Sequence, residues 1–213
     1  MKRLLISMLV LGLVVACKKE PGKPVPNEID TIARINPDSA KVVKNDTLKF
    51  AGLKKTNDEV LQTLKAKDYK TFATFIHPQK GISFSMYAFV DPKGDKHFSK
   101  EDFEKYLPTK TLFTWGAKDG SGDPYKATIN NYLDKWVFSK DFTISQYSLN
   151  KFIGGGNSLN NLKEIYPKAD FTENYSKGTE KNSEMDWKTV RFVFEEFQGK
   201  YYLIAVVNDQ WTI

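Results

Sequence analysis

Residues 187–213, at the end of the chain, constrain the fold more than any other stretch. Two runs rich in Val, Ile, Phe and Tyr flank Gln198-Gly199, and such runs around a short glycine-containing loop predict two strands joined by a hairpin turn. If the loop holds only these two residues, Phe194 pairs with Leu203. Continuing this register outward gives an apolar face made of Val190, Phe192, Phe194, Leu203, Ala205 and Val207. The chain therefore ends in a long antiparallel hairpin that buries one face.

The other face of this hairpin mixes charged, polar and apolar side chains. In the same register it carries the pairs Thr189 with Asn208, Arg191 with Val206, Val193 with Ile204, and Glu195 with Tyr202. Lys188 and Asp209 also fall opposite each other, and an ion pair between them supports the register. A face that is neither clearly core nor clearly solvent-exposed often lines a pocket. The candidate ligand-binding residues on this face are Arg191, Glu195, Tyr202 and Asn208.

The start of the chain has the features of a secretion signal. A basic Met1-Lys2-Arg3 precedes an apolar run from Leu4 to Val15, which is too short for a membrane-spanning helix of about 20 residues. The run ends in Val14-Val15-Ala16-Cys17, which closely resembles a bacterial lipobox. That resemblance implies that the thiol of Cys17 receives a diacylglyceryl group, that residues 1–16 are removed as a signal peptide, and that the new amino terminus is acylated. A buried core cysteine is the alternative, but the coincidence of signal, small residue and sole cysteine favours lipidation.

Lipid anchoring sets where the protein works and which partners it meets. Lys18 replaces the aspartate that retains lipoproteins in the inner membrane of enteric bacteria, so we expect an outer-membrane location in a cell that has one. Removing Lys2 and Arg3 from the 32 basic residues leaves 30 against 26 acidic ones, a balance of +4. This mild excess favours an anionic bilayer surface, and the cell envelope gives no access to nucleic acid. Without a second cysteine the mature domain has no disulfide framework.

A tether and an irregular lead-in separate the lipid from the folded domain. Three prolines between residues 18 and 27 interrupt helix and strand alike, and the apolar residues from 29 to 50 are scattered. We therefore assign residues 17–50 to the tether and lead-in. Residues 51–213 form a single domain, which is large enough to bury its own core.

Within that domain, caps and periodicity predict helices first and strands later. Asn57 or Thr56 caps one helix and Asp68 caps a second, so the domain begins with two helices in a bent pair. From Ile82 to Val90 the period changes to two residues, which predicts a strand with one apolar face. Hydroxyl-bearing side chains gather on its other face: Ser83, Ser85 and Tyr87. Further helices are expected over 99–107, 128–136 and 157–167, and further strands over 111–115, 142–149 and 169–175.

Helices followed by a sheet that ends in a long hairpin form the layout of the nuclear transport factor 2-like fold, and Lys65-Ala-Lys-Asp-Tyr69 resembles its helix junction. Further segments are similar to a family of bacterial secreted and lipid-anchored proteins with no assigned activity: Phe75-Ile-His-Pro78, Phe113-Thr-Trp-Gly116, Gly156-Asn-Ser-Leu-Asn160 and Asn208-Asp-Gln-Trp-Thr-Ile213. The match covers most of residues 55–213. It implies an α+β fold in which N-terminal helices pack on a strongly curved, cone-shaped antiparallel sheet. The wider fold includes ketosteroid isomerase and polyketide cyclases, but their acid and base have no matching positions here.

No sequence motif for a metal ion or a cofactor is complete. The loop from Asp119 to Pro124 resembles the start of a calcium loop, but it lacks the glycine at the sixth position and the bidentate glutamate at the twelfth. The glycine run 154–156 lacks the lysine of a phosphate-binding loop. His77 and His97, the only histidines, have no second ligand nearby in the sequence. We therefore expect no metal and no cofactor, and interpret His77 as a helix cap or, alternatively, as a general base.

These features favour a non-catalytic, lipid-anchored envelope module that binds a small polar or anionic ligand or an envelope protein. The expected cavity lies between the strand and the hairpin, and its lining is Ser85, Tyr87, Arg191, Glu195, Tyr202 and Asn208. The alternatives are a hydrolase or isomerase that uses a cavity carboxylate or His77, and a purely structural envelope module. Glu195 and Asp209 lie on opposite faces in the expected register, so they do not form an acid-base pair. For the cavity itself, the alternative is a hydrogen-bonded polar plug with no room for a ligand.

Overall fold

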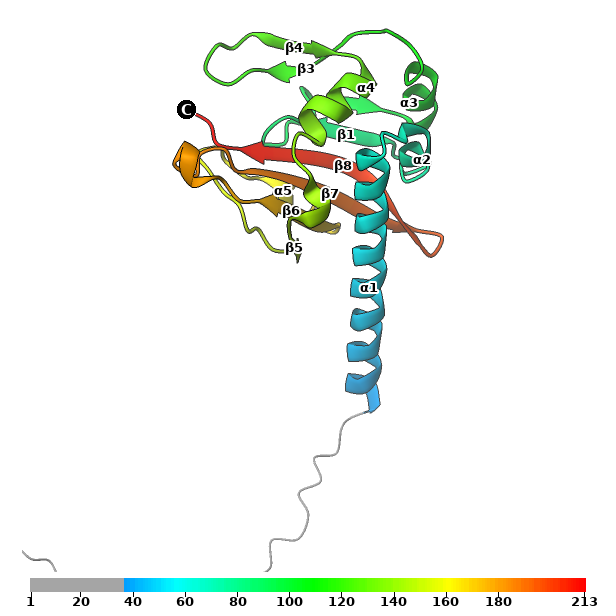
Figure 1. Cartoon of the computed structure of the whole chain (residues 1–213). Helices are drawn as coiled ribbons and strands as arrows, with labels where there is room; N and C mark the ends of the chain where they lie inside the picture. Colours follow the sequence, from blue (N-terminus) through cyan, green and yellow to red (C-terminus); the bar gives the residue numbers. More distant parts are fainter. Residues whose placement is uncertain (1–36) are drawn as a thin grey trace, which may run out of the picture.

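The computed structural model describes the backbone from residue 37 and the side chains from residue 46 to the end of the chain (Figure 1). The predicted signal peptide and the lipidation site at Cys17 lie outside the described residues. Helices and a six-stranded sheet form the body of the molecule, and a separate two-stranded hairpin stands beside them.

The first helix, α1 (Pro37–Lys65), is longer than the sequence pattern suggests. Residues 37–50, expected as an irregular lead-in, form its first turns, and Figure 1 shows these turns extending away from the sheet. The second half of α1 buries Leu53, Val60 and Leu64 in the core. The helix is therefore continuous from the lead-in into the domain.

Asn57 lies inside α1, which corrects the expectation that it starts a helix. Its Oδ1 accepts hydrogen bonds from Thr172 Oγ1 at 2.7 Å and from Asn174 Nδ2 at 2.9 Å. A buried amide needs such partners, and here they come from the sheet rather than from the backbone of a first helical turn. The side chain thus ties α1 to the sheet.

The shorter helices α2 (Tyr69–Ala73), α3 (Lys100–Tyr106) and α4 (Ile129–Tyr132) begin where the sequence predicts. Their caps are Asp68, Ser99 and Thr128, whose side-chain oxygens accept a backbone hydrogen bond from the first turn. The described residues contain four further helical segments: a π-helical turn at Leu133–Val137, 3-10 turns at Phe142–Ile144 and Glu180–Asn182, and α5 (Leu162–Ile165).

The main sheet has six strands in the order β2-β1-β8-β7-β6-β5. The strands are β1 (Ile82–Ser85), β2 (Lys96–Phe98), β5 (Gln146–Leu149), β6 (Asp170–Ser176), β7 (Lys188–Phe197) and β8 (Lys200–Gln210). The separate hairpin consists of β3 (Phe113–Ala117) and β4 (Pro124–Ala127). The fold class is α+β, as predicted.

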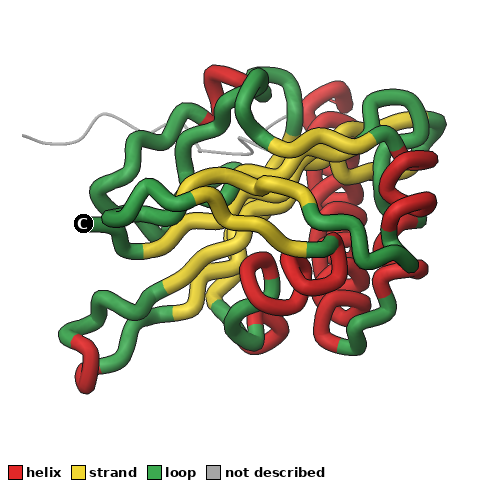
Figure 2. Tube along the Cα trace, turned by 90° about the horizontal axis from the view of Figure 1, so that it is seen from above, coloured by secondary structure: helices red, strands yellow, loops and turns green. Residues whose placement is uncertain are grey.

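The sheet is mixed rather than wholly antiparallel, because β1 runs parallel to β8. The segment before β1 already lies along β8: Leu203 N donates to Phe75 O at 2.7 Å, and His77 N donates to Leu203 O at 2.9 Å. Figure 2 shows a twisted sheet that is not strongly curled. In both respects the structure differs from the strongly curved antiparallel sheet that the resemblance implied.

The C-terminal hairpin has the predicted turn and a bulge that was not predicted. Both residues of Gln198-Gly199 have positive φ, 51° and 75°, and Phe194 pairs with Leu203 as expected. The next residue, Ile204, is an extra residue on β8, and it shifts the register of all pairs further from the turn.

Beyond the bulge, each β7 residue pairs one position further along β8 than expected. Arg191 faces Val207, and Lys188 faces Gln210 rather than Asp209. Asp209 therefore shares a face of the sheet with Arg191 and Glu195, which corrects its expected place on the opposite face. Ala205 and Val207, expected beside Phe192, likewise lie on the face opposite to it.

Apolar side chains are buried on both faces of the sheet. On the face covered by α1, Phe192, Phe194 and Leu203 are fully buried, as the hairpin pattern predicts. On the second face a smaller core joins Val193 to Leu162 of α5. The segment that contains α5 thus packs on the second face and forms one side of the cleft described next.

Candidate functional site

A cleft of about 290 Å³ lies on the second face of the sheet, beside the edge formed by β1 and β2. Its walls come from the turn before β1, from β1 and β2, from the segment after α5, and from the β7–β8 hairpin. Its polar residues are Lys80, Ser83, His97, Tyr166, Lys168 and Glu195. We call it the sheet-face cleft.

Ser83 and His97 face each other across the β1–β2 ladder and line this cleft. Ser83 Oγ lies 3.0 Å from His97 Nδ1, and Ser83 is also hydrogen-bonded to the Tyr166 hydroxyl. Burial raises the pKa of Tyr166, and the hydrogen bond with Ser83 offsets part of that rise. The phenol therefore stays protonated at neutral pH. Three groups able to donate or accept a hydrogen bond therefore meet where the β1–β2 wall adjoins the segment after α5.

The charges around the sheet-face cleft are mainly positive. Lys80 Nζ lies 2.6 Å from Glu195 Oε2, so these two side chains neutralise each other. Lys168 lines the cleft and has no ion-pair partner within residues 46–213. The excess of positive charge favours an anionic ligand over a cationic one.

Ser85, the last residue of β1, contacts Asp95, which directly precedes β2 at the same edge of the sheet. Ser85 donates to Asp95 Oδ2, which also accepts the backbone N–H of Asp91 at 3.0 Å. Burial raises the pKa of Asp95, although both hydrogen bonds lower it. Ser85 was predicted to contact a ligand, but it is buried and its hydroxyl is already engaged.

Among the other predicted site residues, Glu195 lies in the sheet-face cleft, together with Ser83 from the predicted hydroxyl face. His97, Tyr166 and Lys168 were not predicted. β2 spans three residues and α5 spans four, and neither is long enough for periodicity to show which side chains face the sheet.

Arg191 lies at the centre of a buried ionic cluster on the second face. Its Nε donates to Glu173 Oε2 at 2.6 Å, and its Nη2 donates to Asp209 Oδ2 and to Gly154 O, both at 3.1 Å. The side chains of Arg191 and Glu173 are 0% exposed and that of Asp209 is 2% exposed. The guanidinium is thus engaged inside the fold and does not line the sheet-face cleft.

The remaining predicted residues lie apart from one another. The Tyr87 hydroxyl accepts the backbone N–H of Asp119 at 2.8 Å. The Tyr202 ring packs 5.9 Å from the His77 ring, and Asn208 Nδ2 lies 3.4 Å from the carbonyl oxygen of Val137. The bulge turns Asn208 toward the helix-covered face, so these residues do not share one cavity with Glu195.

His77 holds the turn that leads into β1. Its Nδ1 accepts the backbone N–H groups of Gln79 at 3.1 Å and Lys80 at 3.0 Å. The side chain is buried, and burial lowers its pKa, so the ring is neutral. Because Nδ1 is occupied by the backbone, His77 is not placed to act as a general base on a ligand.

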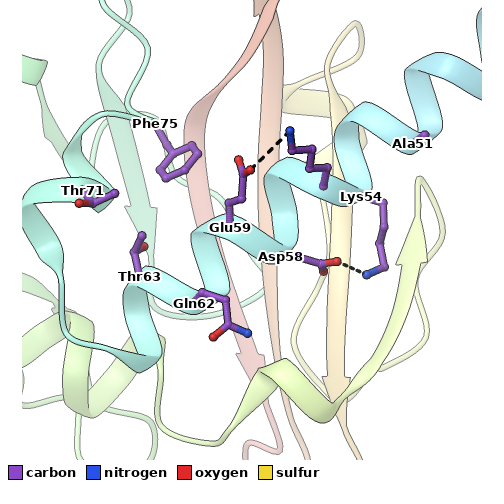
Figure 3. Close-up of a pocket in the computed structure, with 9 residues that line it drawn as sticks. Ala51, Lys54, Asp58, Glu59, Gln62, Thr63, Thr71 and Phe75 are labelled. Atoms are coloured by element: carbon purple, nitrogen blue, oxygen red, sulfur yellow. Dashed lines mark hydrogen bonds and ion pairs between the residues drawn. The ribbon is translucent and has the colours of Figure 1, made fainter.

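A larger and more open groove of about 750 Å³ runs along α1 (Figure 3). Lys54 pairs with Asp58, and Lys55 pairs with Glu59, one turn apart on the same helix. Because these charges neutralise each other, this groove offers less selectivity for a charged ligand than the sheet-face cleft does. We therefore take the sheet-face cleft as the candidate site.

Comparisons with family models, curated proteins and solved structures found no match for this chain. Within the part of the chain that the structure describes, no helix is long and apolar enough to cross a membrane. In the same part, no three His, Cys, Asp or Glu side chains gather as a metal site requires.

Proposed function

We propose that this protein is a lipid-anchored module of the bacterial cell envelope that binds a small polar or anionic ligand in the sheet-face cleft without chemical change. The observation that carries the proposal is the convergence of Ser83, Tyr166 and Lys168 on one cleft with excess positive charge. Hydroxyls together with an ammonium group suit phosphate or carboxylate oxygens.

The envelope location rests on the lipobox resemblance at Cys17, with residence in the outer membrane of a cell that has one. α1 supports this placement, since a helix of 29 residues spans about 43 Å and its first turns extend away from the sheet. Those turns would hold the sheet-face cleft away from the bilayer. We also retain, as part of the proposal, kinship with the nuclear transport factor 2-like fold and with the secreted and lipid-anchored family that the sequence resembles.

The binding proposal is tested by thermal denaturation of the full chain in increasing inorganic phosphate, at constant ionic strength. Phosphate should raise the melting temperature of the parent protein, because a ligand that binds only the folded state stabilises it. Lys168→Gln should lose most of that rise. Lys126→Gln removes an exposed lysine of β4 and should keep the rise. Equal responses from the two variants would contradict the proposal.

A hydrolase is the second candidate function, and the contact of 3.0 Å between Ser83 Oγ and His97 Nδ1 favours it over an isomerase. Within residues 46–213 no carboxylate hydrogen-bonds His97 to orient it, so we rank binding first. A fluorophosphonate probe separates the two. Labelling of Ser83 that is lost in His97→Asn would establish the nucleophile, whereas an unlabelled Ser83 supports binding alone.

A further inference from the structure

A second cleft, of about 590 Å³, lies between the α1–α2 junction, α2, α3 and the start of α4. It shares no residue with the sheet-face cleft. Its apolar wall is formed by Ala73, Leu107 and Pro108, and its polar groups include Tyr69, Lys70 and Asn130. We call it the interhelix cleft. Its volume is in the range of small-molecule sites, which is roughly 300–1,000 Å³.

Tyr69 carries an unused hydrogen-bond donor at this cleft. The residue is 7% exposed, and its hydroxyl has no hydrogen-bond partner among the side chains and backbone of residues 46–213. Burial and the negative charge of Asp134 raise the pKa of Tyr69 to about 12, so the hydroxyl keeps its proton at neutral pH. A buried donor without an acceptor destabilises the fold, and a ligand oxygen placed beside it would remove that cost.

Lys70 brings a positive charge to the interhelix cleft, where the hydrogen bonds from Thr71 and, to a smaller extent, this charge lower the pKa of the neighbouring Asp68. Within residues 46–213 it has no ion-pair partner, although it lines the interhelix cleft. Two of the other charged residues of the cleft are in ion pairs, Lys67 with Asp134 and Glu104 with Lys100. The Asp68 carboxylate keeps its charge and accepts the backbone N–H of Thr71. The cleft thus combines a lysine without a salt bridge, a hydroxyl donor without a partner among the described residues, and an apolar wall.

We propose that the interhelix cleft binds a carboxylate that carries a short hydrocarbon chain. The Tyr69 hydroxyl donates to one carboxylate oxygen, and Lys70 provides the opposite charge. The chain lies against Ala73, Leu107 and Pro108, where its burial adds affinity. An anion without a chain lacks the apolar contact, and an alcohol with the same chain lacks the charge.

The test is calorimetric titration of the full chain with octanoate below its micellar concentration, with acetate and octanol as matched probes. We expect octanoate to bind about tenfold or more tightly than either probe, because each probe lacks one of the two contacts. Tyr69→Phe should weaken octanoate binding about tenfold. Without ligand, the same variant should melt at the parent temperature or above it, because it removes an unpartnered hydroxyl.

Tyr132→Phe is the matched control. Tyr132 also carries a buried hydroxyl that has no partner in the described part of the chain, but it does not line the interhelix cleft. This variant should bind octanoate like the parent. Three results would overturn the inference: no octanoate binding, octanol binding as tightly as octanoate, or unchanged affinity in Tyr69→Phe. A large fall in the melting temperature of unliganded Tyr69→Phe would also overturn it, because the hydroxyl would then be satisfied within the fold.

Discussion

Arg191 Nη2 donates a hydrogen bond of 3.1 Å to Asp209 Oδ2, and the two side chains meet because the bulge at Ile204 turns Asp209 onto the same face of the sheet. The same guanidinium binds Glu173, its direct partner on β6. One buried cation therefore joins three neighbouring strands. Through Gly154 it also holds the loop that covers them.

Arg191→Met should lower the free energy of unfolding by about 3–5 kcal/mol, because it leaves Glu173 and Asp209 as buried carboxylates without their cation. Urea denaturation at pH 7 measures the change. Lys177→Met removes the cation of an exposed pair with Glu184 and should change stability little. If Arg191→Met also changed stability little, the buried cluster would not hold the strands together.

Asp209 should make stability depend on pH. Burial raises its pKa, although Arg191 lowers it. A carboxyl whose pKa is higher in the folded state contributes stability below its unfolded pKa of about 3.9 and loses it as the pH rises through the folded pKa. Between those values the free energy of unfolding of the parent should fall relative to that of Asp209→Asn. A parent that instead gained stability over Asp209→Asn in urea series of rising pH would contradict this assignment.

Phe192→Ala should lower the free energy of unfolding by about 3–5 kcal/mol, because the ring is fully buried on the helix-covered face. Phe89→Ala provides the control, since that ring is 51% exposed and should be far more tolerant. Thermal and urea denaturation of both variants give the comparison. Similar costs for the two substitutions would show that the core is placed wrongly.

Local signals predict much of this fold from sequence. The turn at Gln198-Gly199, the cap at Ser99 and the burial of Phe192 each depend on residues close together in the chain. The bulge at Ile204 cannot be recognised from the sequence, because the residues that follow it are all apolar up to Val207 and fit either face of the sheet. A shift of one residue therefore leaves no trace in the hydrophobic pattern.

The candidate site was predicted only in part for a similar reason. Ser83 and Glu195 lie in segments whose side chains alternate regularly over many residues, so their faces can be predicted. The structure brings both residues to the sheet-face cleft. His97 and Tyr166 reach the same cleft from short elements, through contacts distant in sequence. The buried partners of Arg191 follow from the shifted register, which is itself a long-range feature.

Cys17→Ser should abolish lipid attachment and leave unprocessed or released protein, since it removes the thiol that the lipobox resemblance assigns to the diacylglyceryl group. Labelling with a radioactive fatty acid, followed by membrane fractionation, measures both effects. A variant that still fractionated with membranes and still incorporated lipid would rule out anchoring at this cysteine.

The sheet-face cleft is tested most directly by amide NMR spectra of the full chain during titration with inorganic phosphate. We predict saturable chemical-shift changes centred on Ser83, His97 and Lys168, and their loss in Lys168→Gln. Changes confined to the α1 groove around Thr63 and Phe75, or no saturable change at the three cleft residues, would contradict the account.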